Sequence, residues 1–260
     1  MTLGKTSNES LSGVLLVGHG TRDKSGTDEF FQLKEQLTEV IGSLPVEAAL
    51  LEFQEPSIPK GWAMLVEQGV RHIHVAPLLL FAAGHAKQDI PAAIKACQAE
   101  TPSVTFDQCD PLSRHAKIIE LLLLRIRALA SRVHSVANRT ALVMVGRGSY
   151  DPCATSDMRI LSQLIQHRTH FGCVTTAFYA MASPKLPEVL DNLALSGRFD
   201  SILIQPHLLF SGRLYQAIEK QVSAAAQSHP NIQWNLGEYL GPHRRVAEAI
   251  AARISYSNGT

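Results

Sequence analysis

The sequence predicts an α/β protein of two similar lobes, each built on a parallel sheet, with an internal duplication. Two observations predict this fold. Short apolar runs alternate with longer amphipathic segments along the whole chain, and the second half of the sequence repeats the first. An apolar content of 45% and a charged content of 18% are ordinary for a globular protein with a real core. The length of 260 residues fits one large domain or two smaller ones, and the repeat favours two.

Eight apolar runs are candidate strands, and helix-length stretches separate them. The stretch after the first run, for example, has apolar residues at three- and four-residue spacing from Phe30 to Ile41. Strands that alternate with helices indicate βαβ units and parallel sheets, whose ligands bind at the carboxyl ends of the strands. The eight expected strands are Gly13–Val17, Val46–Phe53, His72–Pro77, Ser103–Gln108, Thr140–Val145, Gly172–Phe178, Ser201–Pro206 and Ile232–Leu236.

The repeat is visible in three segments that match in the same order. GVLLVGHGTRD, which begins at Gly13, aligns with ALVMVGRGSYD, which begins 128 residues later at Ala141. The same offset aligns ALLEFQEPSIP (49–59) with AFYAMASPKLP (177–187), including both prolines, and APLLLFAAGH (76–85) matches QPHLLFSGR (205–213) with a one-residue slip. We therefore place an N-terminal lobe at residues 13–135 and a C-terminal lobe at residues 136–260.

The two repeats keep the same glycines, prolines and apolar positions but differ at three polar ones. In the first repeat these are possible metal ligands or proton acceptors, and in the second two of them are permanent cations. The pairs are His19 with Arg147, Glu52 with Ala180, and His85 with Arg213. This asymmetry predicts a single site in a cleft between the lobes, with its chemical groups in the first lobe.

His19 follows the first expected strand in the turn Gly18-His19-Gly20-Thr21. Flanking glycines let the backbone turn sharply there and expose the imidazole. The turn has no third glycine for a dinucleotide fingerprint and no Gly-Lys-Ser/Thr for a P-loop, so nucleotide binding is weakly supported. The alternative role for His19 is a hydrogen bond to the backbone of its own turn; the repeat comparison favours a functional role.

Two further residues are expected at the same sheet edge. His85 closes the loop after the third strand, with Asp89 beyond it as a helix N-cap or as a partner that fixes the imidazole tautomer. In the second strand segment either Glu52 or Glu55 faces the cleft, and the repeat comparison favours Glu52. His72 and His74 share one strand face and could form a metal pair, although a packing role is favoured there. His207, which replaces Leu78 in the repeat, is a weaker candidate for lining the cleft.

Two histidines and a carboxylate are an incomplete shell for a permanent metal, because structural zinc sites are usually four-coordinate and closed. An incomplete shell suits transient handling of a hydrated divalent ion. Imidazole binds iron, cobalt, nickel and zinc alike, so these ligands do not select the metal. Histidine also accepts protons near neutral pH, so the same residues can take up protons that a ligand releases when it binds a metal ion.

At these motifs the sequence resembles the class II tetrapyrrole chelatases, and within them the two-domain sirohydrochlorin cobaltochelatases and ferrochelatases. VGHGTRD (17–23) and PLLLFAAGHAKQDIP (77–91) look like the two histidine motifs of that family, while Leu51-Glu52 before PSIP (56–59) matches its glutamate motif less closely. The resemblance covers nearly the whole chain. It implies two flavodoxin-like lobes and an ATP-independent insertion of cobalt or iron, with nickel as a third metal, into sirohydrochlorin.

The resemblance also implies roles for individual residues. It makes His19, His85 and Glu52 the catalytic and metal-binding groups, with no permanent cofactor. Sirohydrochlorin bears eight carboxylates, and because the formal net charge is only +1, specific cations must bind them. The candidates, in order, are Arg147 and Arg213, then Arg22 and Lys87; surface solvation is the alternative role for the last two. Protoporphyrin ferrochelatase and a noncatalytic metal or tetrapyrrole carrier remain the rival functions.

Composition predicts the cellular setting. The near-neutral charge argues against nucleic-acid binding by bulk electrostatics, and the most apolar run, 118–130, is broken by charges and too short to cross a bilayer. The first twelve residues lack the apolar core of a secretory signal. The four cysteines form no C-x-x-C pair, which favours free thiols in a reducing compartment. We therefore expect a cytoplasmic protein, and the fused repeats favour a monomer.

Overall fold

The computed structural model describes residues 11–81 and 88–257, and in this part of the chain the two halves have the same succession of elements. The first half contains β1 (Ser12–Gly18), α1 (Lys24–Ile41), β2 (Val46–Leu50), α2 (Ile58–Glu67), β3 (His72–Pro77), α3 (Ile90–Glu100), β4 (Thr105–Gln108) and α4 (Ala116–Ala130). The second contains β5 (Thr140–Gly146), α5 (Pro152–Arg168), β6 (Cys173–Phe178), α6 (Leu186–Leu195), β7 (Ser201–Pro206), α7 (Arg213–Ser228), β8 (Gln233–Leu236) and α8 (Arg244–Ser257). A short 3₁₀ helix (Ala137–Arg139) lies between the halves.

The strands form two separate four-stranded sheets with equivalent topology. The orders are β2-β1-β3-β4 and β6-β5-β7-β8, and every pairing is parallel. The predicted α/β fold with two similar parallel-sheet lobes is therefore confirmed. All eight expected strands are present, but the second was predicted too long. It ends at Leu50 instead of Phe53, because the chain leaves the sheet there and Phe53 adopts a positive φ of 72°.

Equivalent residues begin the first helix of each lobe. Asp23 accepts a hydrogen bond from the Ser25 amide (3.1 Å), and Asp151, its counterpart in the repeat, accepts one from the Cys153 amide (2.8 Å). Such N-caps satisfy amides that the helix itself leaves unbonded. The repeat is thus a repeat of backbone geometry as well as of residue type, which makes equivalent positions comparable.

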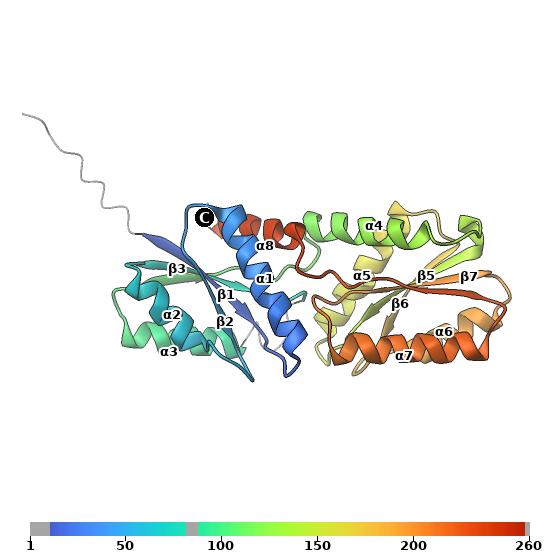
Figure 1. Ribbon diagram of the computed structural model, residues 1–260, viewed down its shortest axis with the longest axis horizontal. Helices are drawn as coiled ribbons and strands as arrows, with labels where there is room; N and C mark the ends of the chain where they lie inside the picture. Colours follow the sequence, from blue (N-terminus) through green and yellow to red (C-terminus); the bar gives the residue numbers. More distant parts are fainter. Residues whose placement is uncertain (1–10, 82–87, 258–260) are drawn as a thin grey trace, which may run out of the picture.

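Helices cover both faces of each sheet, and the lobes lie side by side along the long axis of the molecule (Figure 1). In the first lobe α2 and α3 cover one face, where Trp62, Leu65 and Ile94 are buried. In the second lobe α6 and α7 cover the equivalent face, where Leu190 and Ile218 are buried. The opposite faces of both sheets share one continuous core.

The helix that ends each half packs on the sheet of the other half. In Figure 1 α8 lies over the first lobe and α4 over the second. The contacts agree, since α4 packs against β7, whereas α8 packs against α1 and β3 and also meets α4. The lobe boundary between residues 135 and 136 remains a prediction from the sequence repeat. In the structure α4 precedes this boundary but packs on the second lobe, and α8 follows it but packs on the first lobe. This exchange joins the lobes through buried apolar surface.

Two simpler expectations concern the membrane and the thiols. Across residues 11–81 and 88–257, the helices are all too short or too polar to cross a membrane. Cys97, Cys109, Cys153 and Cys173 are all free thiols, as predicted, and the first two are buried.

Candidate functional site

The loop that carries His19 is fastened to the loop that carries Glu52. Pairing between β1 and β2 continues beyond the strand ends, because the Leu51 amide donates to the Gly18 carbonyl (2.9 Å) and the Glu52 amide donates to the His19 carbonyl (3.0 Å). Parallel strands that end together place their following loops at one sheet edge. The two residues that the sequence proposed from separate segments are therefore neighbours in the backbone.

Gly20 permits this close approach. Its φ is +90°, which side chains rarely adopt, and a Cβ atom there would lie 2.0 Å from the Glu52 carbonyl oxygen. Gly148, its counterpart, has a φ of +91°, and a Cβ there would lie 1.9 Å from the Ala180 oxygen. Both lobes thus build the same tight junction, but only the first equips it with a histidine and a carboxylate.

The His19 ring is oriented from two sides. Its Nδ1 lies 3.2 Å from the Gly20 carbonyl oxygen; a carbonyl only accepts, so the ring donates from Nδ1 and a neutral ring carries its lone pair on Nε2. The backbone bond considered as an alternative role is therefore present, and it directs Nε2 away from the turn. The ring also stacks on Phe53 at 6.3 Å between centroids, with 26° between the planes.

Phe53, which the sequence did not single out, also lies beside His19. Its side chain is 51% exposed beside His19, and the Arg22 guanidinium carbon lies 4.9 Å from its ring centre. A cation over an aromatic face is attracted electrostatically, so Arg22 is held near the site. The available signal was the position of Phe53 directly after Glu52, but the residue was assigned to the preceding strand.

Glu52 and Glu55 separate into different roles. The Glu55 carboxylate accepts a hydrogen bond from the Ser57 amide (2.8 Å) at the start of α2. The Glu52 side chain is exposed in the loop next to His19. Of the two carboxylates considered from the sequence, Glu55 is engaged by a backbone amide. This arrangement supports Glu52 as the carboxylate that is available to a ligand.

A cavity of about 140 Å³ adjoins His19 between the lobes. The first lobe lines it with the turn at residues 18–21 and with Phe30, and the second lines it with Leu209, Phe210 and Ser211. The lobes are joined beside it, because the Ser211 amide donates to Glu29 (2.8 Å) and the hydroxyls of Ser25 and Ser211 lie 2.8 Å apart. Loops at the carboxyl ends of β1 and β7 therefore enclose the space that His19 faces.

His207 lies next to this region in an unusual state. It is 2% exposed, its ring lies 5.2 Å from that of Phe81, and neither ring nitrogen has a hydrogen-bond partner in the described part of the chain. Burial lowers the pKa of His207 to about 3, so the ring is neutral at physiological pH. An unbonded buried imidazole is costly, and its equivalent in the first lobe is the apolar Leu78.

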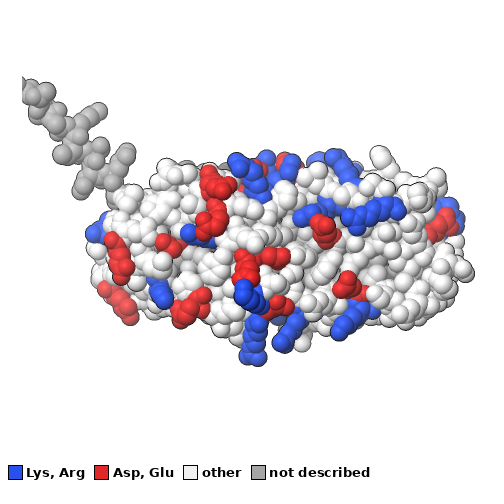
Figure 2. Space-filling view, in the orientation of Figure 1, with Lys and Arg blue, Asp and Glu red and all other residues white. Residues whose placement is uncertain are grey.

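The arginines proposed from the repeat lie at the carboxyl edge of the second sheet. Arg147 is exposed directly after β5, and the Ala180 amide donates to its carbonyl (2.9 Å), as the Glu52 amide does to His19. Arg213 is exposed at the start of α7, two residues after Ser211 of the cavity wall. On the face shown in Figure 2, basic and acidic side chains are mixed over both lobes, consistent with a net charge of +1.

Two predicted site residues, His85 and Lys87, lie outside the described residues. Asp89 occupies the N-cap position of α3, but its side chain makes no capping hydrogen bond. The predicted N-cap position of Asp89 is therefore confirmed, without the side-chain hydrogen bond that commonly accompanies it. A helix that starts with Pro91 in its first turn needs fewer capped amides, since proline has no N–H.

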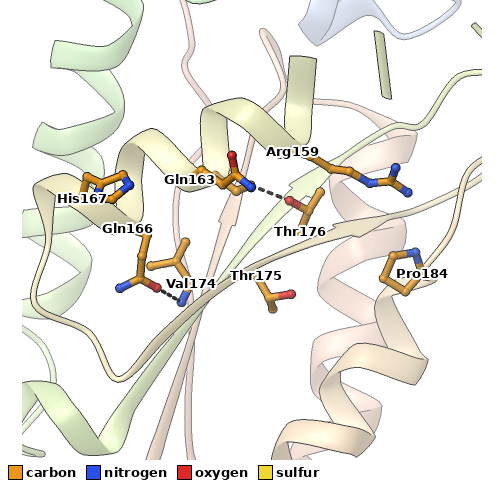
Figure 3. A pocket seen from close by; sticks show the side chains of 9 residues that line it. Arg159, Gln163, Gln166, His167, Val174, Thr175, Thr176 and Pro184 are labelled. Carbon is orange, nitrogen blue, oxygen red and sulfur yellow. Dashed lines mark hydrogen bonds between the residues drawn. The ribbon is translucent and has the colours of Figure 1, made fainter. Parts of the chain in front are cut away.

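A larger hollow of about 620 Å³ lies away from these residues, between α5 and the edge strand β6 (Figure 3). Two pairs of its lining residues are hydrogen-bonded to each other: Gln166 accepts from the Val174 amide (2.6 Å), and the Thr176 hydroxyl donates to Ser162 (2.7 Å). None of the site residues predicted from the sequence lines it. The larger hollow therefore lies apart from the residues that the sequence proposed, whereas the smaller cavity adjoins His19.

Comparison with known proteins gives this geometry a family. A model of the CbiX family matches residues 13–129 and again residues 141–257. The chain belongs to the CbiX family. Because one family unit matches each half, the internal duplication inferred from the three segments is a duplication of the CbiX unit, and the resemblance stated from the motifs is confirmed.

Individual relatives agree with the CbiX assignment. A sirohydrochlorin cobaltochelatase of Priestia megaterium is 31% identical over 243 residues, covering 94% of this chain and 79% of the relative. A sirohydrochlorin ferrochelatase of the same organism is 32% identical over 247 residues, covering 94% and 90%. The structure of SirB from Bacillus subtilis with Fe³⁺ superposes with a TM-score of 0.84 at 31% identity, covering 96% of this chain and 98% of SirB. The two chelatases named for different metals are equally similar to this chain, so overall identity does not select the metal.

Proposed function

We propose that this protein is an ATP-independent chelatase that inserts Co²⁺ or Fe²⁺, with Ni²⁺ as a third candidate, into sirohydrochlorin, a step of siroheme and cobalamin biosynthesis. The observation that carries the proposal is the junction of the His19 and Glu52 loops beside a cavity between two lobes. Membership of the CbiX family and relatives named as sirohydrochlorin chelatases support it.

The chemistry needs a weak hold on the metal and a place for two protons. Sirohydrochlorin loses two pyrrole N–H protons as M²⁺ enters, so charge is balanced. In the proposed reaction the Nε2 lone pair of His19 and the Glu52 carboxylate bind the incoming ion, and each can take a proton once the ion has moved to the macrocycle. His85 is proposed as the second imidazole of this set on the strength of its sequence motif.

The protein would bind both the carboxylates at the periphery of the substrate and the face of its macrocycle. Arg147 and Arg213 are proposed to bind the carboxylates, with Arg22 and Lys87 as additional cations, because guanidinium groups match carboxylates with paired hydrogen bonds. Within the described chain several other arginines already pair with acids, such as Arg114 with Asp157 and Arg139 with Asp200. The exposed ring of Phe53, beside Arg22, is proposed to contact the macrocycle.

The first test follows the absorbance of sirohydrochlorin anaerobically with Co²⁺, Fe²⁺ and Ni²⁺ in separate reactions. We expect wild type to accelerate insertion without ATP and Glu52→Ala to lose about tenfold or more, because a ligand and proton acceptor is removed. Ala180 occupies the equivalent position, so the scaffold tolerates alanine there. If folded wild type accelerates insertion with none of the three metals, sirohydrochlorin is not the substrate, and protoporphyrin or metal carriage should be tested.

A second prediction concerns the arginines proposed to bind the carboxylates of the substrate. Arg147→Ala and Arg213→Ala should each raise the KM for sirohydrochlorin about 5- to 30-fold, as expected for a lost charge-assisted contact of about 1–2 kcal/mol, and should change kcat less. Arg198→Ala is the matched control, since this exposed arginine precedes β7 at the opposite edge of the same sheet. Equal effects of all three substitutions would instead indicate long-range attraction by the net charge.

We further propose that the protein acts as a cytoplasmic monomer. The four free thiols support a reducing compartment. The second lobe supports the monomer, since one chain supplies both walls of the cavity beside His19.

A further inference from the structure

A second group of metal-binding side chains lies away from His19, on β3 and β4. His72 Nε2 and His74 Nδ1 both approach Asp107 Oδ1, at 2.8 and 2.6 Å, and the two rings meet edge to face at 4.6 Å between centroids. One ligand atom from each of the three residues lies within 4.8 Å of the others. Two imidazoles and one carboxylate thus converge on one point.

This group is separated from the site at the carboxyl edge of the sheet. His72 is the first residue of β3, and β3 reaches that edge only at Pro77. At about 3.3 Å per residue, His72 and His74 lie about 10–16 Å of strand away from the edge where the His19 loop begins. The histidines share a strand face with Ala76, which belongs to the core shared by the lobes.

The repeat shows that packing does not require these residues. Through the pairing of β5 with β7 and of β7 with β8, the positions of His72, His74 and Asp107 are occupied in the second lobe by Ser201, Leu203 and Asn235. Leu203 is fully buried, and His74 is 1% exposed. The same fold therefore fills this position with an apolar side chain, whereas the first lobe buries an imidazole at a cost that needs compensation.

The hydrogen bonds around His72 hold its ring in place beside Asp107. The Thr105 hydroxyl lies 2.8 Å from His72 Nδ1 and 3.3 Å from the Arg71 carbonyl oxygen, and these contacts fix the orientation of the His72 ring. Nε2 of the same ring lies 2.8 Å from Asp107 Oδ1. The second carboxylate oxygen, Oδ2, is buried without a hydrogen-bond partner among the described residues. The two imidazole nitrogens and the carboxylate thus form a compact set of ligand atoms, with one carboxylate oxygen still available to a ligand.

We propose that His72, His74 and Asp107 bind a divalent transition-metal ion, at a second site independent of the tetrapyrrole. Two imidazoles and a carboxylate suit Co²⁺, Zn²⁺, Ni²⁺ or Fe²⁺ at about 2.0–2.2 Å from each ligand atom, with water completing the shell. Thr105 orients the His72 ring from outside, as partners of metal-binding histidines commonly do. The ion ties β3 to β4 in the first lobe only.

The test is Co²⁺ binding to the metal-free full-length chain, by equilibrium dialysis and by visible absorption. We expect two Co²⁺ per wild-type chain and one in His74→Leu and in Asp107→Asn, which copy Leu203 and Asn235 of the second lobe. His19→Ala should lose the other ion, and His19→Ala/His74→Leu should lose both. Equal Co²⁺ binding by wild type and His74→Leu, or no binding by His19→Ala, would overturn the second site. Loss of one ion in His74→Leu but none in His19→Ala would support it while contradicting metal binding at His19.

A thermal measurement guards against loss of folding. In the His19→Ala background Co²⁺ should raise the melting temperature by about 5 °C, as saturating binding to the folded state requires, and adding Asp107→Asn should abolish the rise. A rise that persists in Asp107→Asn would contradict the assignment. With metal in excess, His74→Leu should insert metal into sirohydrochlorin within about twofold of the wild-type rate; a larger loss would place His74 in the chelatase reaction instead.

Discussion

Replacing His19 by arginine should slow metal insertion by about 100-fold or more and leave the fold intact. Proton acceptors and metal ligands at reacting centres contribute about 10²- to 10⁴-fold, and a guanidinium can neither accept a proton nor bind a cation at neutral pH. The fold should tolerate the change, because the equivalent turn of the second lobe carries Arg147 with the same backbone hydrogen bond, from the Ala180 amide at 2.9 Å.

The measurement is the insertion rate under saturating sirohydrochlorin and metal, with circular dichroism and thermal unfolding as checks of the fold. Arg147→His is the reciprocal control: it should create no second site, since its neighbour at the junction is Ala180 and not a carboxylate. Retention of more than a tenth of wild-type activity in a folded His19→Arg protein would remove His19 from the reaction. Loss of folding in this variant would contradict the equivalence of the two turns.

Local sequence patterns predicted the strands well because the strands are short, the central ones are apolar, and polar or glycine-rich turns bound them. They did not predict where α4 and α8 pack. The apolar stripe of α4 shows that one face is buried, but it carries no information about the sheet that buries it. Only the tertiary structure shows that α4 packs against β7 and α8 against β3.

The candidate site could be proposed from the sequence because the two repeats differ at a few polar positions. His19 and Glu52 were singled out because the second repeat has Arg147 and Ala180 in their places, and the structure brings their two loops together. Phe53 was missed for a related reason: its counterpart, Met181, is also apolar, and both adopt a positive φ that breaks the strand. Apolar residues after an apolar run favour a longer strand, so sequence alone assigned Phe53 to the sheet instead of placing it beside His19.

The junction between the His19 and Glu52 loops should be as sensitive as the side chains it carries. Gly20→Ala places a Cβ 2.0 Å from the Glu52 carbonyl oxygen at a φ of +90°, so the Glu52 loop must move. We expect the free energy of unfolding to fall by about 3 kcal/mol, the sum of backbone strain and a displaced buried contact. Insertion should fall about tenfold or more in the protein that remains folded, because the carboxylate moves away from His19.

Substitutions of Gly42 and Gly148 distinguish backbone strain from displacement of the Glu52 loop as the cause of the effect of Gly20→Ala. Gly42 has a φ of +71°, and a Cβ atom there would meet no other atom of the described residues within 4 Å, so Gly42→Ala carries strain alone and should cost about 1 kcal/mol with no change in insertion. Gly148→Ala meets the Ala180 oxygen at 1.9 Å and should destabilise as much as Gly20→Ala, while affecting the KM for sirohydrochlorin through Arg147 more than kcat. Denaturant unfolding and steady-state kinetics on the three variants distinguish these outcomes. If Gly148→Ala lowers kcat as strongly as Gly20→Ala, general loosening of the chain is the cause; if only Gly20→Ala does, the reaction depends on the spacing between His19 and Glu52.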